Sequence, residues 1–341
     1  MIPPKYPNRL APQHADATFG SGVGTSLLPP VDKSLSSADK PIVAIFSFGE
    51  MGMGIAALLT KFLYRIVTNL DGRSAKTKAR ALAIGVEDLP LEKVLNEASI
   101  FISIVPPAEA LPLAQKTAAA FQLLPCSEKQ DLTYLDLNAI SPGLARQVGQ
   151  VIIGAGMTFV DGAIIGFPPK ELEDKTWFRP AITTSGPQLD DQKSTFTTQL
   201  VSLLNVRHVG DEIGAGSGLK MCFGAIYKDQ AAVATQAYTT AQSLGVLSAL
   251  RSHLGKYFPT STPIIESSLV GSQRKAYRWI KEMEEVEDTF AEGGWSRDLF
   301  RGVSNVFRVV AHKTNLEQQS KEDVEVITGE ICLGLRRTKC I

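Results

Sequence analysis

The sequence lacks the patterns that mark a metal centre, a disulfide scaffold or a membrane protein. Its 4 cysteines form no CxxC pair and its 4 histidines are widely scattered, so no spacing is typical of zinc ligands or of a disulfide framework. No apolar run reaches the roughly 20 residues that a membrane-spanning helix needs, and the N-terminus lacks the apolar segment of a secretory signal. We therefore expect reduced thiols, no metal, no membrane partner and a cytoplasmic location.

An excess of one charge is also absent. The chain has 35 basic and 35 acidic residues, which gives no electrostatic footprint for nucleic acid. With 341 residues, of which 44% are hydrophobic, it can bury a sizeable core, and this length predicts two domains. Residues 1–39 are rich in proline and small polar residues and have no sustained hydrophobic period, so we expect a flexible N-terminal extension. A transit peptide is the less favoured alternative, because Asp16 and the prolines disrupt a basic amphipathic helix.

Residues 41–63 are the stretch around which the chain is organised. A short apolar run breaks at a glycine-rich turn and resumes with helical spacing, which predicts a strand, a phosphate-binding turn and a helix. Glycines at such a turn let the backbone approach a pyrophosphate, whose charge then lies on the N-terminal amides of the helix. The turn corresponds to GxGxxG with serine in the first glycine's place, and its predicted cofactor-binding residues are Ser47, Phe48, Gly49, Glu50, Met51 and Gly52.

The segment from Asp71 to Gly85 follows the second predicted strand, where a dinucleotide fold selects its cofactor. A carboxylate there would bind a ribose 2′-hydroxyl, whereas arginine accommodates a 2′-phosphate. Arg73 and Ser74 offer donors suited to a phosphate group, so we expect NADP, with NADPH preferred over NADH. The alternative is that Arg73 is an ordinary solvated turn residue and that Asp71 caps the next helix.

Two further apolar runs, residues 99–105 and 133–137, are each predicted to be buried strands that end in polar or proline-containing loops. In an open parallel sheet the carboxyl ends of the strands form the ligand crevice. We therefore assign Ser103, Val105 and Pro106 to the cofactor, and Asn138 and Ser141 to the substrate. Each of these residues taken alone is typical of a turn or a cap.

The remaining pattern changes from alternating strands and helices to helices alone. Residues 157–169 and 181–185 are predicted strands, whereas residues 214–246 and the segments around 271–294 and 295–314 have helical periodicity. The predicted fold class is α/β followed by all-α. We expect a Rossmann-type dinucleotide-binding domain at 40–212 and a helical substrate and dimerisation domain at 213–341. The acidic run at 282–288 is interpreted as a solvated helix face, and Trp177, Trp279 and Trp295 as packing residues.

In their order, three motifs resemble the β-hydroxyacid dehydrogenase superfamily, which includes 6-phosphogluconate dehydrogenase and the imine reductases. They are the glycine turn at 48–52, VDGAIIG at 160–166, and the start of a helix at 216–220. Details at 72–74 and 278–290 further resemble a phosphogluconate-dehydrogenase-like branch with its own C-terminal helical domain. The resemblance implies hydride transfer between NADP(H) and a carbonyl or alcohol carbon, in a cleft between the domains of a homodimer that associates through the helical domain. It also implies that Lys220 is the catalytic residue.

The residues around Lys220 agree with a proton-transfer role. This lysine follows a glycine-rich helix entry and has small and apolar neighbours, which would desolvate its amine and lower its pKa towards working pH. Without the resemblance, Lys220 would be interpreted as a solvated helix residue.

The predicted substrate residues from the two later motifs are largely apolar. Family members commonly have a serine and paired glycines in the substrate loop and an asparagine three or four positions after the lysine, whereas this chain has Gly162, Ile165 and Gly166 in the loop, and Phe223 and Gly224 after the lysine. Because a buried carboxylate without partners costs several kcal/mol, we expect a relatively apolar substrate. An imine reductase or a decarboxylating hydroxyacid dehydrogenase remains an alternative, as does an NADPH-binding sensor or scaffold without turnover.

Overall fold

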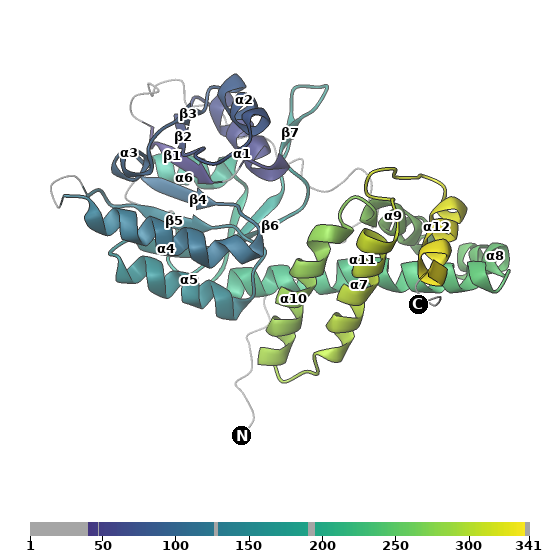
Figure 1. The fold of residues 1–341 in the computed structure, drawn as a ribbon. Helices are drawn as coiled ribbons and strands as arrows, with labels where there is room; N and C mark the ends of the chain where they lie inside the picture. Colours follow the sequence, from purple (N-terminus) through teal and green to yellow (C-terminus); the bar gives the residue numbers. More distant parts are fainter. Residues whose placement is uncertain (1–39, 47, 126–128, 190–194, 338–341) are drawn as a thin grey trace, which may run out of the picture.

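The computed structural model describes residues 40–46, 48–125, 129–189 and 195–337. The predicted N-terminal extension and Ser47 of the glycine turn therefore lie outside the described residues. An α/β part is followed by helices only (Figure 1), so the predicted fold class is confirmed.

Eight strands form one sheet in the order β10-β9-β6-β5-β4-β1-β2-β3. The strands β1 to β6 are parallel, β9 is antiparallel to β6, and β10 is parallel to β9. The carboxyl ends of β1 to β6 therefore gather at one edge of the sheet, where ligands bind in such folds. The strands are β1 Val43–Phe46, β2 Ile66–Thr68, β3 Glu87–Asp88, β4 Ile100–Ser103, β5 Thr133–Asp136, β6 Thr158–Ile165, β9 Ala181–Ser185 and β10 Val206–Gly210.

Helices cover both faces of this sheet, because its central strands are apolar on both sides. Ile45 and Ile102 belong to a core shared with α1 and α6, whereas Phe46, Phe101 and Tyr134 belong to a core shared with α3, α4 and α5. Adjacent aromatic rings of the second core stack at 4.5 and 4.9 Å. The helices are α1 Glu50–Lys61, α2 Ala75–Ala83, α3 Leu91–Glu97, α4 Pro107–Leu123, α5 Pro142–Gly154 and α6 Thr195–Leu203.

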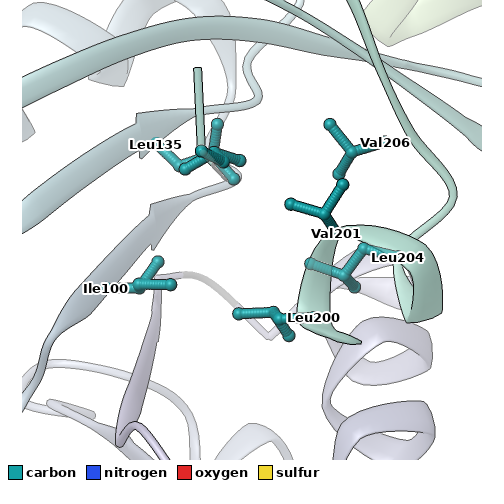
Figure 2. A pocket seen from close by; sticks show the side chains of 7 residues that line it. Ile100, Leu135, Leu200, Val201, Leu204 and Val206 are labelled. Carbon is teal, nitrogen blue, oxygen red and sulfur yellow. The ribbon is translucent and has the colours of Figure 1, made fainter. Parts of the chain in front are cut away.

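A small cavity lies in the first core, between the sheet and α6 (Figure 2). Its volume is about 10 Å³, and the side chains of Ile100, Leu135, Leu200, Val201 and Val206 are among those that line it. A water molecule needs at least this much space and also two to four polar partners. The cavity is therefore a packing gap rather than a ligand site.

The helical part is built along α7, a helix of 29 residues that runs from the sheet through the rest of the molecule (Figure 1). A third core, which includes Tyr238, Trp279, Met283 and Phe307, joins α7 to the helices that cross it. In the part of the chain that the structure describes, no helix combines the length and apolar character needed to span a membrane. The remaining elements are β7 Lys170–Glu171, β8 Trp177–Phe178, α7 Ala215–Ser243, α8 Leu247–Tyr257, α9 Ser261–Ser272, α10 Ala276–Glu292, α11 Asp298–Lys313 and α12 Val324–Arg337.

Two expectations about side chains in this part are wrong. The run at 282–288 is not a solvated face, because Glu285 and Glu287 are 4% and 8% exposed. Glu287 is paired with Arg301 at 2.9 Å, and such pairing makes burial of a carboxylate tolerable. Trp295, predicted to pack, is 71% exposed in the turn between α10 and α11, whereas Trp177 and Trp279 are buried as expected.

Candidate active site

The start of α7 is fixed to the sheet by Asp161 of β6. Its fully buried carboxylate accepts hydrogen bonds from the Gly214 and Ser217 amides at 2.9 and 3.0 Å, from the Ser185 hydroxyl at 2.9 Å and from the Ser217 hydroxyl. The first amides of a helix have no partner within the helix, and its dipole favours a negative charge at that end. A carboxylate from the sheet therefore replaces a local cap, since the N-cap residue is Gly214.

Lys220 lies in the second turn of α7 and turns back towards the same strand. Its Nζ donates to the Ile164 carbonyl oxygen at 2.7 Å, three residues after Asp161. The pKa of Lys220 is lowered to about 8, chiefly by burial and then by the charge of Lys228; Glu282 opposes this shift and Arg278 adds to it. The amine can therefore gain and lose a proton near neutral pH, as a general acid or base must.

Lys228 lies just over two turns after Lys220 on α7, about 80° further around the helix, since each residue advances it by about 100°. Its side chain is 6% exposed, and its Nζ lies 2.5 Å from Glu282 Oε2 on α10. Gly224 lies between the two lysines, and a Cβ added there would be 3.8 Å from Lys228 Nζ. A cation thus lies beside the position where an asparagine was expected, so the region is less apolar than the sequence indicated.

Aromatic side chains connect α7 to the loop after β6. Phe223 stacks with Tyr227, with ring centroids 6.4 Å apart, and Tyr227 meets Trp279 edge-on at 6.1 Å. Lys275 Nζ lies 5.9 Å from the Trp279 ring centroid and 5.2 Å from that of Phe167. Phe223 and Phe167 are 41% and 62% exposed, so this wall offers apolar surface with a cation above it.

The predicted residues at the ends of β4 and β5 form one buried network. Asn138 Oδ1 accepts from the Val105 amide at 2.6 Å, and Asn138 Nδ2 donates to Ser103 Oγ and to Asp136 Oδ2, both at 2.9 Å. Both amide hydrogens of Asn138 are thus used, and Ser103 is fully buried. The network holds the two loops in place, and the exposed Pro106 follows it as the N-cap of α4.

Ser141 connects the sheet to the helical part. Its hydroxyl caps α5 by accepting from the Leu144 amide at 3.4 Å, and its own amide donates to Glu285 Oε2 at 2.9 Å. A second contact between the parts is the Arg146–Glu292 ion pair at 2.8 Å. Ser141 therefore sets how α10 lies against the carboxyl end of the sheet.

The three predicted residues of the substrate loop lie in different surroundings. Gly162 is buried in β6, where an added Cβ would approach Leu137 and the Thr183 carbonyl oxygen to 2.9 Å. Ile165 is half-buried at the end of β6, and Gly166 is exposed with φ of 131°. Gly162 thus serves packing of the sheet, whereas Gly166 allows the loop a conformation that disfavours any side chain.

The glycine turn lies at the carboxyl end of β1, as the sequence predicted. Phe48 is 2% exposed and belongs to the core, Gly49 is the N-cap of α1, and Glu50 and Met51 begin the helix, with Gly52 buried behind them. Apart from the chain neighbours of Gly49, no atom of the described residues lies within 4 Å of a Cβ added there. The backbone at Gly49 is therefore open to a ligand, and it leads directly into a helix N-terminus.

Arg73 and Ser74 lie in the loop after β2, at the start of α2. The Ser74 hydroxyl accepts from the Thr77 amide at 3.2 Å, so Ser74 rather than Asp71 caps this helix. Arg73 is exposed, and Arg80 Nη2 of α2 donates to the Phe48 carbonyl oxygen at 3.3 Å. Arg80 was not predicted as a residue of the glycine turn. Its place seven residues after Arg73, about two helical turns away, could have indicated it.

Lys228, Glu282 and Lys275 were also missed. Lys228 follows Lys220 at a spacing that a helical projection detects. By contrast, pairing of Lys228 with Glu282 joins residues 54 apart and depends on how α10 crosses α7. Among the described residues, no three His, Cys, Asp or Glu side chains are grouped so that they could hold a metal ion.

Solved structures with the 3-hydroxyacid dehydrogenase fold match this chain, so the resemblance indicated by the motifs is confirmed at the level of the fold. Residues 241–310 match a domain of unknown function, DUF1932. The chain is 25% identical over 273 residues to an uncharacterized 28.5 kDa protein from Methanothermus fervidus, covering 78% of this chain and 97% of that protein.

Two solved structures illustrate the fold. Conserved protein MTH1747, of unknown function and described as similar to 3-hydroxyacid dehydrogenases, is 26% identical with a TM-score of 0.58, over 79% of this chain and 97% of that one. The 3-hydroxyisobutyrate dehydrogenase of Mycobacterium tuberculosis is 18% identical with a TM-score of 0.62, over 85% of this chain and 98% of that one.

Proposed function

We propose that the protein is an NADP(H)-dependent oxidoreductase in which Lys220 exchanges a proton with the reacting oxygen of a carbonyl or alcohol substrate. The observation that carries the proposal is the position of Lys220: its amine lies at the carboxyl edge of the sheet, bonded to the Ile164 carbonyl, and burial lowers its pKa to about 8. The dehydrogenase fold supports the same assignment.

The residues of the glycine turn fit a dinucleotide. The open backbone at Gly49, followed by Glu50, Met51 and Gly52 in the first turn of α1, would receive a pyrophosphate on unpaired helix amides. When bound, the nicotinamide would supply or accept a hydride. The exposed Arg73 and the Ser74-capped start of α2 would bind a ribose 2′-phosphate, which supports NADPH over NADH.

The direction of proton transfer follows from the charge state of Lys220. In reduction its ammonium would protonate the developing alkoxide, and in oxidation its neutral amine would accept the alcohol proton. Reduction should therefore weaken as pH rises above about 8, and oxidation should strengthen over the same range. Ser141, Asn138, Gly162, Ile165, Gly166, Phe223 and Gly224 remain the proposed substrate-side residues, with Asn138 and Gly162 acting through the backbone that they position.

The aromatic wall supports a substrate with an apolar portion. Phe167 and Phe223 expose ring surface, which favours contact with hydrocarbon over a carboxylate without partners. We assign the substrate site to the junction of residues 40–212 and 213–341, with the helical part also forming the contact between two copies of the chain. Leu219, Ile226 and Val233 are exposed at helical spacing on α7, a stripe that a second copy would cover.

The test measures cofactor binding and turnover separately. NADPH and NADH are titrated by fluorescence against wild type, Arg73→Ala and Lys220→Met, and a panel of bulky ketones, aldehydes, imines and small hydroxyacids is then assayed by absorbance of the reduced cofactor. Arg73→Ala should weaken NADPH binding about tenfold, equivalent to about 1.4 kcal/mol, and leave NADH unchanged.

Lys220→Met should preserve NADPH binding and lower turnover at least about 100-fold, the scale of a lost general acid or base. Turnover of the imines alone would favour an imine reductase, and faster turnover of small hydroxyacids would overturn the apolar substrate. Absence of binding to either cofactor would reject the oxidoreductase. Tight NADPH binding without any reaction would instead support a sensor or scaffold.

A further inference from the structure

The ion pair joins Lys228, two turns after Lys220 on α7, to Glu282 on α10, and it is too buried to be a surface contact. The two side chains are 6% and 18% exposed. An ion pair buried in this way contributes little net stability compared with apolar residues of similar volume, whereas loss of one partner leaves an uncompensated charge. Stability alone therefore does not account for the pair.

Gly224 leaves the charge of Lys228 free to act on Lys220 without an intervening side chain at that position. Lys228 Nζ points back along α7 to the level of Gly224, because a Cβ built there would lie 3.8 Å from it. Long helical side chains lean towards the N-terminus in this way. Since Gly224 has no side chain and is itself buried, no side chain at that position separates the two lysines, and little solvent screens them.

We propose that Lys228 and Glu282 form a positioning pair that sets the charge state of Lys220 without contacting the substrate. This inference rests on the proposed proton transfer by Lys220. Lys228 supplies a fixed positive charge, and Glu282 from α10 holds that charge in place. Lys228 Nζ lies beside Gly224, one of the two positions at which the resemblance implies an asparagine after the lysine.

The other charged groups that face Lys220 act in the expected directions. Lys228 of α7 lowers the pKa of Lys220 more than any other charge. From α10, Glu282 raises this pKa and Arg278 lowers it. Strand β6 faces the amine with the Ile164 carbonyl, which stabilises the charged form. Lys275, which precedes α10, is subject to the charges of Arg278 and Glu282 as well.

Substitutions that remove the positive charge and those that remove the negative charge of the pair should shift the pKa of Lys220 in opposite directions. In Lys228→Met the lowering charge is removed and Glu282 is left uncompensated, so the pKa of Lys220 should rise by about one unit. Lys228→Arg keeps the charge and should restore a value near wild type. In Lys228→Arg combined with Glu282→Gln, the guanidinium cannot lose its proton, so the pKa of Lys220 should fall below that of Lys228→Arg.

The experiment measures the titration of Lys220 directly in the full-length protein. Acetic anhydride labels neutral amines, and mass spectrometry of the peptide containing Lys220 gives its labelling rate from pH 6 to pH 11. Arg251→Met is the matched control, since it breaks the Arg251–Glu266 ion pair at 2.8 Å in the same helical part. It should lower thermal stability without moving the Lys220 titration.

The outcomes separate this inference from the proposed function. The expected set of opposite shifts, with the control unmoved, supports the pair even if no substrate is turned over, in which case only the proposed function fails. An unchanged Lys220 titration in Lys228→Met overturns the pair even if the enzyme is active, as does the same shift in Arg251→Met. A wild-type titration that stays near that of a free lysine also overturns it.

Discussion

Replacement of Asp161 by asparagine should detach the start of α7 from the sheet. The substitution keeps the size of the side chain but leaves one acceptor oxygen where the carboxylate has two. The native carboxylate accepts from the Gly214 and Ser217 amides and from the Ser185 and Ser217 hydroxyls. With the asparagine oxygen in the place of Oδ2, the three donors from Gly214, Ser217 and Ser185 keep a neutral acceptor, whereas the new NH₂ group replaces Oδ1 and the hydrogen bond from the Ser217 hydroxyl is lost.

The magnitude follows from the burial of the site. A hydrogen bond to an ionised group contributes about 1.5–3 kcal/mol and one between neutral groups about 0.5–1.5 kcal/mol. Loss of one bond and of the charge on the other three therefore gives about 4 kcal/mol with partial relaxation. For a domain of this size that corresponds to a fall in Tm of roughly 10 °C. Because Lys220 lies only six residues after Gly214, turnover should also fall under conditions in which the variant remains folded.

Differential scanning calorimetry with a matched aspartate checks this prediction. Asp174 bonds Thr176 in an exposed turn, so Asp174→Asn makes the same chemical change without burial. It should stay within about 2 °C of wild type, as neutral surface substitutions do. If Asp161→Asn is as stable as Asp174→Asn, the carboxylate does not hold α7 and the reasoning is refuted.

Two further predictions concern packing and association. Gly54→Ala should destabilise the protein by about 1–3 kcal/mol, because its Cβ would lie 2.8 Å from the Pro169 carbonyl oxygen; chemical denaturation that gives an unchanged free energy of unfolding would contradict this. Ile226→Glu should convert the proposed dimer to a monomer in light scattering, since Ile226 is 78% exposed on α7, while Ile153→Glu on α5 should leave the mass unchanged. A monomeric wild type would reject the dimer.

The sequence was sufficient for the elements that depend on local pattern. The turn at Gly49 and the long helix α7 were predicted because glycine spacing and an alanine-rich helical period are local signals. The small strands β3, β7 and β8 were not, since each has two residues and forms only when a partner strand is present. The same distinction applies to side chains.

The acidic run of α10 shows why part of the candidate site escaped prediction. Charged residues on a helix are usually solvated, and the sequence gives no sign that Glu282 meets Lys228 or that Glu285 receives the Ser141 amide. These contacts join residues 54 and 144 positions apart. Only the crossing of α10 over α7 and α5 creates them, and that crossing is a property of the whole helical part.

The strand β6 unites these observations. Asp161 fixes the start of α7 and Ile164 receives the Lys220 amine, so the reactive group is held to the sheet at two points three residues apart. The charges that act on it come instead from the helical part, Lys228 from α7 and Glu282 and Arg278 from α10. The position of Lys220 is therefore set by the α/β part and its protonation by the helical part. A substitution that shifts α10, at Glu285 for instance, which accepts from the Ser141 amide, should change the pH dependence before it changes the geometry of the amine.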